Sequence, residues 1–337
     1  MKALALEWQM LLPKLQHKKI ESIYFGGGTP TLLGADNIRT ILSWIDYPST
    51  CEITIEANPE EVTLSLMQEL TQAGINRVSI GVQSFDDPSL TVLGRNHNSQ
   101  KAVQAVEAAH KAGISNISID LMYDLPEQTL ESWTSTLVQV KELPISHLSL
   151  YNLTIEPNTS FFKRKERLSP LLPTQETSLQ MLDAAVSSLE SFGLRRYEIS
   201  AFAKEGKESH HNVGYWTARP FLGFGPSAFS YEEKKRYRNC ANLHQYSTLV
   251  HAGQSPVDFS EQLSYPDDLH ELLAIELRLI KGVHLDNFEK RHGKLPKTTY
   301  EKLEILQQKG WIERDEKTVK LTKEGLLFYD SVAVELI

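Results

Sequence analysis

A run of three glycines, Gly26 to Gly28, follows a short apolar segment near the start of the chain and precedes Thr29 and Pro30. Because glycine has no side chain, its backbone N–H and C=O groups stay open to close approach by a ligand. Pro30 restricts the backbone at the exit of the turn. The run therefore predicts a turn that holds a small polar group of a bound molecule.

Four polar side chains further along the chain suit the same kind of ligand. Glu56 ends a β-branched segment and could accept hydroxyl groups, and Gln83 ends the next such segment. Arg95 could bind a carboxylate with two parallel hydrogen bonds. Asp120 is flanked by apolar residues, so its charge needs a partner such as a ligand hydroxyl. The alternative for the first three is an ordinary exposed polar side chain or a surface salt bridge.

His211 is a candidate of a different kind. It lies in a segment, 209–216, that also contains Tyr215 and Trp216, and Arg219 follows. Imidazole is a common axial ligand of heme iron, and aromatic walls with one basic group suit a porphyrin and its propionates. The alternative is a histidine with a structural role in a loop. The histidines at positions 97, 147 and 284 have no comparable surroundings, and the sequence assigns them no role.

The first 155 residues alternate between helical and strand-like patterns. Apolar residues recur at helical spacing in 4–15, 37–45, 64–73, 102–112 and 130–142, and strand-like runs cover 22–25, 52–57, 77–82, 116–122 and 147–153. Repeated β–α units predict a parallel sheet with right-handed crossovers, in which ligands bind at the carboxyl ends of the strands. The glycine turn, Glu56, Gln83, Asp120 and Thr154 fall at those ends. The pattern predicts a cofactor site at this rim.

After residue 173 the pattern changes, and we divide the chain into three segments. An α/β segment covers 1–173, an extension with His211 covers 174–262, and a C-terminal segment covers 263–337. The extension is expected to hold a helix at 174–192, a strand at 196–200, and loops or short elements at 210–231. In the C-terminal segment we expect three helices, a β-hairpin at 311–321 and a final helix at 323–336, which is typical of a winged-helix module.

Composition restricts the partners and the compartment. Acidic residues outnumber basic ones by 43 to 35, and the net charge is −8, so a nucleic-acid partner is not expected. The sequence contains no apolar run of membrane-spanning length and starts without the apolar core of a signal peptide, so we expect a cytoplasmic protein without stable membrane insertion. Cys51 and Cys240 are expected to be unpaired thiols that are buried or half-buried.

These motifs together resemble a known family. The segments 25–30, 52–60, 79–86, 93–96, 119–129, 147–159, 197–202 and 211–216 are similar, in this order, to the radical SAM family of oxygen-independent coproporphyrinogen oxidase and its relative, the heme chaperone HemW. The resemblance runs from Met1 to the C-terminus. It implies an α/β fold: a partial (β/α) radical-SAM-type barrel with five of its six strands, followed by a helical, winged-helix-like C-terminal domain.

The resemblance also assigns residues to cofactors. It implies that S-adenosylmethionine (SAM) binds at the predicted rim through Gly27, Gly28, Thr29, Glu56, Gln83, Arg95, Asp120 and Thr154. The segment 211–216 reads His-Asn-Val-Gly-Tyr-Trp and matches the H-N-x-x-Y-W signature that HemW carries and the oxidase lacks, which places heme iron on His211. The resemblance therefore favours a chaperone that binds heme and passes it to an acceptor protein. The alternative is a radical SAM oxidase that decarboxylates coproporphyrinogen.

One departure from the family affects the chemistry. Family members begin with a strand that carries three cysteines as C-x-x-x-C-x-x-C, which bind a [4Fe–4S] cluster, and neither the motif nor the strand occurs in this sequence. Two cysteines cannot hold the cluster, so reductive cleavage of SAM, and with it oxidase activity, is not expected of this sequence. Either the chain starts at an internal methionine of a longer product, or it is a member that has dispensed with the cluster.

Two smaller consequences follow from the comparison with the family pattern. Without a preceding strand, the strand at 22–25 is expected to be an unpaired sheet edge. Asp124 and Glu127 stand where the family often has glycine, which puts the local turn in question.

Overall fold

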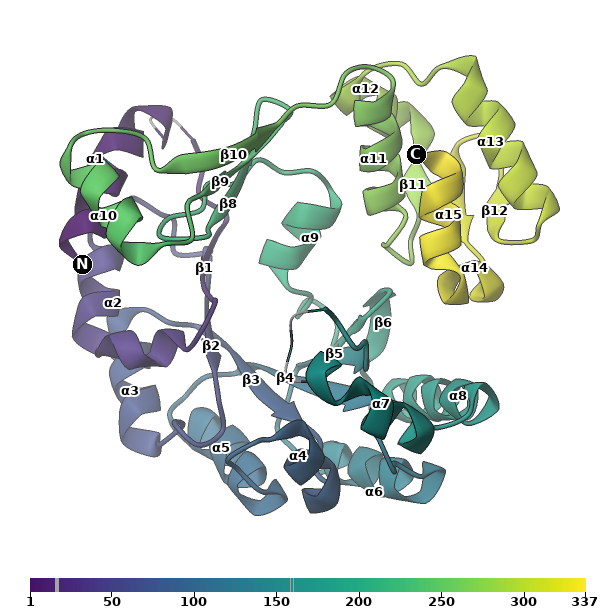
Figure 1. Cartoon of the computed structure of the whole chain (residues 1–337), viewed down its shortest axis with the longest axis horizontal. Coiled ribbons are helices and arrows are strands. Elements are labelled where there is room, and N and C mark those ends of the chain that lie inside the picture. Colours follow the sequence, from purple (N-terminus) through teal and green to yellow (C-terminus); the bar gives the residue numbers. More distant parts are fainter. Residues whose placement is uncertain (16–17, 158, 160) are drawn as a thin grey trace. The chain divides into compact units, whose positions relative to one another are not determined.

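The computed structural model of the protein describes residues 1–15, 18–157, 159 and 161–337 (Figure 1). Contacts divide the chain into two compact units. We call Ile20–Ser209 the sheet unit, and we call Met1–Lys19 together with His210–Ile337 the terminal unit. The sheet unit extends past residue 173 because the strands after that point join its sheet. The three-segment division remains a prediction.

The sheet unit alternates strands and helices along most of its length. Its elements are β1 (Ser22–Phe25), η1 (Pro30–Leu33), α2 (Gly34–Leu42), β2 (Glu52–Ala57), α3 (Leu64–Ala73), β3 (Arg77–Gln83), α4 (Asp87–Leu93), α5 (Ser99–Lys111), β4 (Asn116–Tyr123), α6 (Leu130–Lys141), β5 (His147–Asn152), η2 (Phe162–Arg164), α7 (Lys165–Leu168), η3 (Ser169–Leu171), α8 (Gln175–Ser191), β6 (Arg195–Glu198) and β7 (Ala201–Ala203). Several helices begin at a polar N-cap whose side chain accepts a backbone N–H. These caps are Thr63, Asp86, Asn98, Thr129 and Thr174.

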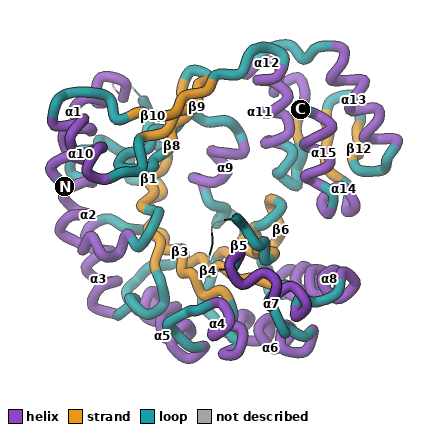
Figure 2. The backbone as a smooth tube through the Cα atoms, in the orientation of Figure 1, coloured by secondary structure: helices purple, strands orange, loops and turns teal. Residues whose placement is uncertain are grey.

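One sheet organises this unit, with strand order β1-β2-β3-β4-β5-β7-β6. Figure 2 shows strands in orange and labels β1, β3, β4, β5 and β6 of this sheet. The first five strands are parallel, as the sequence predicts, and β1 is at the edge. The single strand predicted at 196–200 is wrong in detail. The chain turns there, so β6 and β7 run antiparallel to each other and β7 pairs with β5.

The parallel strands alternate between apolar and polar side chains. In register, Val78 lies between Ile55 and Ile117, and on the opposite face Ser79 lies between Glu56 and Ser118. Parallel sheets that are covered by helices on both faces normally read as continuous apolar runs. The alternation therefore marks one face of this sheet as the place for a polar ligand or a polar network.

The apolar face of the sheet packs against helices α2, α3, α5, α6 and α8 to form the core of the unit (Figure 1). Ile38, Met67, Val106 and Trp133 are fully buried there. Burying a side chain of this size contributes roughly 1.5–3 kcal/mol. The indole of Trp133 also donates to the carbonyl of Met181 at 2.8 Å, which ties α6 to α8.

The turn after β4 explains one departure from the family pattern. Asp124 and Glu127 adopt φ values of +61° and +64°, a backbone conformation that favours glycine. The Asp124 carboxylate accepts a hydrogen bond from Asn152 at 2.6 Å, and the N–H of Glu127 donates to Leu171 at 2.7 Å. Hydrogen bonds to residues distant in the sequence thus support a turn that glycine would adopt without strain.

The terminal unit contains shorter elements. They are α1 (Lys2–Leu15), α9 (His210–Trp216), β8 (Phe229–Glu232), β9 (Lys235–Asn239), α10 (Leu243–His251), β10 (Val257–Glu261), α11 (Asp267–Glu276), β11 (Val283–His284), α12 (Leu285–His292), α13 (Lys297–Gln308), β12 (Ile312–Arg314), β13 (Thr318–Leu321), α14 (Lys323–Leu327) and α15 (Tyr329–Leu336). The predicted C-terminal helices and hairpin are present, although the final helix breaks at Phe328 and β11 adds a third strand to the hairpin.

Helix α1 is held in the terminal unit by a buried carboxylate. Glu7 accepts hydrogen bonds from the backbone N–H of Gly225 at 2.8 Å, from Asn239 at 2.5 Å and from the hydroxyl of Tyr246 at 2.6 Å. Burial raises the pKa of Glu7, and these hydrogen bonds act in the opposite direction. Among the described helices, none has the length and apolar character that crossing a bilayer requires.

Candidate functional site

A cavity of about 200 Å³ lies at the carboxyl ends of the parallel strands of the sheet unit. Its lining comes from the turn after β1, the ends of β2 and β3, and β4. The lining residues are Gly28, Thr29, Pro30, Glu56, Ala57, Asn58, Ser79, Gly81, Gln83 and Asp120. Five predicted SAM contacts are thus brought together, namely Gly28, Thr29, Glu56, Gln83 and Asp120. This is the polar face of the sheet, at the rim that the sequence predicts.

Glu56 is fixed in place by two donors. The hydroxyl of Tyr24 donates to Oε1 of Glu56 at 2.8 Å, and the backbone N–H of Gly27 donates to Oε2 at 3.0 Å. Burial raises the pKa of the Tyr24 hydroxyl, and the Glu56 charge adds to the shift, so this hydroxyl stays protonated and remains a donor. The carboxylate therefore keeps acceptor capacity for ligand hydroxyls in a fixed orientation.

The glycine turn provides space as well as backbone conformation. A Cβ on Gly26 would lie 2.7 Å from the Tyr24 ring and 3.2 Å from the carboxyl carbon of Glu56. Gly27 and Gly28 adopt φ values of +78° and +64°, which side chains disfavour. Thr29 follows, and its hydroxyl accepts a weak hydrogen bond from Asn58 at 3.4 Å.

Asp120 is the most perturbed acid that lines the cavity. Burial raises the pKa of Asp120 to about 6. Hydrogen bonds from Ser149 and Ser79 and the charge of Arg77 lower the pKa, but burial has the larger effect. Near neutral pH the carboxylate is therefore charged but poorly solvated. A ligand hydroxyl that donated to it would relieve part of this cost.

The raised pKa of Asp120 predicts a pH-dependent effect on stability. Because the folded pKa lies above the unfolded value of 3.8, ionised Asp120 destabilises the fold above pH 6, and this cost disappears as the pH falls through 6 toward 3.8. Asp120→Asn should therefore raise the free energy of unfolding by about 1–3 kcal/mol at pH 7.5, and by much less at pH 4.5. Urea unfolding at both pH values measures this. Equal gains at the two pH values, or a gain in the exposed control Asp46→Asn, would contradict it.

Three predicted SAM contacts, Gly27, Arg95 and Thr154, are not among the residues that line the cavity. Arg95 is half-buried and follows α4, where its backbone N–H donates to Leu90 at 3.0 Å. Thr154 is exposed and follows β5. Gly27 lies next to the cavity through its bond to Glu56. The roles of these three residues toward SAM remain predictions.

His211 lies on the short helix α9 of the terminal unit. Its Nε2 is 2.8 Å from the hydroxyl of Tyr215, one helical turn away, and the two rings meet edge to face at 4.8 Å. Tyr215 in turn meets Phe221 edge to face at 4.6 Å. The motif residues thus form a small aromatic cluster around one imidazole.

The remaining motif residues fix α9 rather than face the imidazole. Gly214 is buried, and a Cβ there would lie 2.3 Å from the guanidinium of Arg219, which bonds the carbonyl of His210. The Trp216 ring lies 4.3 Å from the guanidinium carbon of Arg278. Gly214, at the second x position of H-N-x-x-Y-W, and the tryptophan of the signature therefore serve packing in this chain.

The cysteines do not fit an iron–sulfur cluster. Cys51 lies in the sheet unit and Cys240 in the terminal unit, and both are buried and free, as predicted. Within residues 1–15, 18–157, 159 and 161–337, no group of three or more His, Cys, Asp or Glu side chains could hold a metal ion. A [4Fe–4S] cluster needs three or four thiolates. The two cysteines of this sequence do not meet that requirement.

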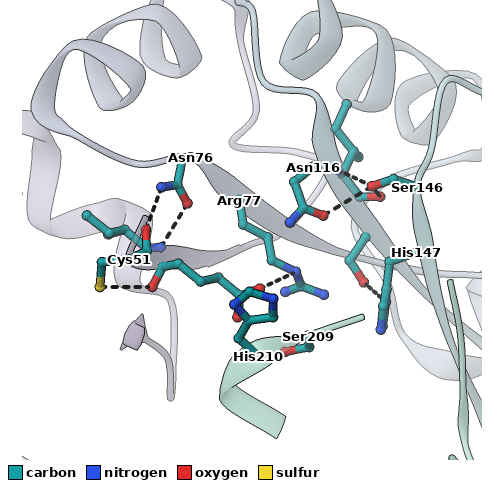
Figure 3. A network of polar contacts seen from close by, with 12 residues as sticks. Cys51, Asn76, Arg77, Asn116, Ser146, His147, Ser209 and His210 are labelled. Atoms are coloured by element: carbon teal, nitrogen blue, oxygen red, sulfur yellow. Dashed lines mark hydrogen bonds and ion pairs between the residues drawn. The ribbon is translucent and has the colours of Figure 1, made fainter. Parts of the chain in front are cut away.

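A second polar layer lies at the amino ends of the same strands (Figure 3). Arg77 is 2% exposed, and its Nε lies 3.9 Å from the carboxylate of Glu52. Both nitrogens of the His147 ring are hydrogen-bonded: Nδ1 lies 2.8 Å from the hydroxyl of Ser118, and Nε2 lies 2.9 Å from the hydroxyl of Tyr197. Burial, with the charge of Arg77 as a smaller cause, lowers the pKa of His147 well below its usual value. This layer is a structural network.

Sequence reasoning missed some of the residues that shape the cavity. Tyr24 supports Glu56, and Asn58, Ser79 and Gly81 contribute to the lining. Tyr24 and Ser79 could have been found, because each is the polar member of the period-two alternation in its strand. Gly81 could not be found from the alternation. It leaves room for the side chain of Gln83, whose Nε2 would lie 3.1 Å from a Cβ at position 81.

Comparisons with known proteins agree with this architecture. The model of the Radical SAM superfamily matches residues 6–139, and that of the HemN C-terminal domain matches residues 263–328. The solved structure of coproporphyrinogen III oxidase (HemN) from Escherichia coli, a radical SAM enzyme, has a TM-score of 0.85 and 24% identity, and the match covers 99% of this chain and 82% of that chain. The predicted fold class, a partial radical-SAM-type barrel with a C-terminal domain, is confirmed.

Sequence relatives narrow the family. The heme chaperone HemW of Bacillus subtilis is 33% identical over 336 residues, which cover 97% of this chain and 89% of the relative. The heme chaperone HemW of Lactococcus lactis is 33% identical over 318 residues, which cover 91% of this chain and 82% of the relative. Together with the H-N-x-x-Y-W helix and the strand-end cavity, these matches lead to one conclusion: the chain belongs to the HemW family of the radical SAM superfamily.

Proposed function

We propose that this protein is a heme carrier: it binds one heme through His211 and passes it to an acceptor protein, and its sheet unit binds SAM. The observation that carries the proposal is the H-N-x-x-Y-W helix α9 in a chain that is 33% identical to a heme chaperone over nearly its full length.

The surroundings of His211 support a role as iron ligand. Nε2 of His211 lies 2.8 Å from the Tyr215 hydroxyl, and in the tautomer that accepts from this hydroxyl, Nε2 carries the lone pair that binds metals. His211 would exchange this hydroxyl for the iron when heme binds. Aromatic side chains of Tyr215 and Phe221 offer apolar contacts, and Arg219 offers a cation for a propionate.

The cavity of the sheet unit supports SAM binding. Glu56 suits two ribose hydroxyls, Gln83 and Asp120 provide further polar groups, and the glycine turn leaves backbone groups open. In the family, a cluster-bound SAM supplies radical chemistry, and the two cysteines of this sequence do not fit that cluster. We therefore propose SAM as a bound ligand and not as a source of catalysis by this sequence.

Heme transfer tests the carrier role. The protein is loaded with one equivalent of hemin, separated from free hemin, and mixed with a heme-free globin, whose absorbance reports the heme it gains. Most of the heme is expected to move to the globin, because a carrier must release its cargo. Heme that stays on the protein throughout, or that washes off before mixing, would contradict the proposal.

A further inference from the structure

We infer that His97 is a positioning residue for the SAM site: it holds the strained turn that presents Gln83 to the cavity. The inference rests on the proposed binding of SAM. His97 has no place in the family assignment given above, and it does not line the cavity. Its side chain is fully buried, which makes each contact of its ring informative.

The turn at Gln83 is unusual. Gln83 has a φ of +66°, and the N–H of Ser84 donates to the carbonyl of Val82 at 2.8 Å. A hydrogen bond across two residues with this φ defines the rare form of the γ-turn, which is strained for a residue with a side chain. Such strain persists only where surrounding contacts hold it.

The strand pairing changes at the same point. Ile80 pairs with Ile119, and Gln83 pairs with Leu121, so β3 advances three residues where β4 advances two. An extra residue of this kind is a β-bulge, and bulges next to sites change the direction of a side chain. The bulge and the γ-turn together place Gln83 in the cavity lining.

His97 bonds the carbonyl that closes this turn. Its Nε2 lies 3.1 Å from the oxygen of Val82, so Nε2 carries the proton and donates to the same oxygen as Ser84. Its Nδ1 lies 3.3 Å from the carboxylate of Glu60, which follows β2. The ring therefore lies between Val82 of β3 and Glu60 after β2. Its hydrogen bond goes to Val82, and Nδ1 forms none with Glu60.

The same contact closes a loop that carries a second predicted SAM contact. The chain leaves the sheet at Gln83, forms α4, turns at Gly94 with a φ of +71°, and passes through Arg95 before His97 returns to Val82. Two hydrogen bonds join the ends of the loop: that from His97 to Val82, and that from the N–H of Ser99 to the carboxylate of Asp87 at 2.7 Å. Loss of the first would loosen the turn at Gln83, to which it is adjacent.

Two measurements on His97→Ala, His97→Gln and the exposed control His110→Ala test the inference. The first is amide hydrogen exchange of Ser84 in the ligand-free protein, and the second is SAM affinity by calorimetry. Loss of a buried hydrogen bond in His97→Ala should speed the exchange of Ser84 about tenfold and weaken SAM binding about tenfold. Glutamine retains an N–H donor, so His97→Gln should recover most of both effects, and His110→Ala should change neither.

The outcomes separate the inference from the proposed function. Wild-type protein that does not bind SAM would overturn SAM binding, whereas the exchange of Ser84 would still test the role of His97 in the turn. Unchanged exchange and unchanged SAM affinity in a folded His97→Ala would overturn the inference. If the alanine variant does not fold, His97→Leu, which fills the buried space without a donor, decides: exchange of Ser84 that is about tenfold faster supports the inference, and wild-type exchange in the folded variant overturns it.

Discussion

Replacing Glu7 with alanine should lower the free energy of unfolding of the terminal unit by about 3–5 kcal/mol. Glu7 is 2% exposed, and its carboxylate accepts from Gly225, Asn239 and Tyr246. Removal of the carboxylate takes away the buried acceptor of these three donors, and buried donors without an acceptor lower the stability of the folded state. The same change should loosen the attachment of α1, which keeps the ring contact of Trp8 with Phe224 and the ion pair of Lys14 with Glu232.

Thermal and urea unfolding of Glu7→Ala, compared with Glu335→Ala, measure this effect. Glu335 pairs with Lys309 at the partly exposed surface of the same unit, at 2.6 Å. Surface pairs of this kind contribute only about 0–1 kcal/mol, so the control should unfold almost as the wild type does. If Glu7→Ala unfolded at the same temperature and the same urea concentration as the control, the carboxylate would not hold α1.

Replacing Glu56 with alanine should weaken SAM binding by about 10- to 100-fold, because hydrogen bonds to a charged acceptor contribute roughly 1.5–3 kcal/mol. Glu56 is held in orientation by the side chain of Tyr24 and by the backbone N–H of Gly27. The loss should be in affinity and not in stoichiometry, since the rest of the cavity lining is unchanged.

Calorimetric titration with SAM measures the affinity of Glu56→Ala, and Glu69→Ala serves as the matched control. Glu69 is exposed on α3 of the same unit and accepts a hydrogen bond from the hydroxyl of Ser65 at 3.0 Å. Tyr24→Phe should give a smaller loss than Glu56→Ala, because it removes one of the two donors that orient the carboxylate. Equal SAM affinity in wild type and Glu56→Ala would contradict the placement of SAM in this cavity.

The sequence was sufficient to predict the parallel sheet and its polar rim. Runs of β-branched residues show where each strand ends. Parallel strands bring their carboxyl ends to the same edge of the sheet, regardless of the conformation of the loops. Glu56, Gln83 and Asp120 could therefore be assigned to one site before their distances were known.

Features that depend on contacts between distant residues could not be predicted. The bond between His97 and Val82 spans 15 residues, and that between Glu7 and Tyr246 spans 239. Neither follows from local propensity or periodicity. The hairpin of β6 and β7 was missed for a related reason: a short turn at 199–200 divides what reads as one strand.

Titration of the purified protein with hemin, followed by the Soret band, tests the central claim most directly. His211→Ala is compared with the wild type and with His244→Ala, which changes an exposed histidine on α10 of the same unit. The account predicts saturable binding of one heme by the wild type and by His244→Ala, and loss of that specific band in His211→Ala. Stoichiometric binding that survives unchanged in His211→Ala would contradict it.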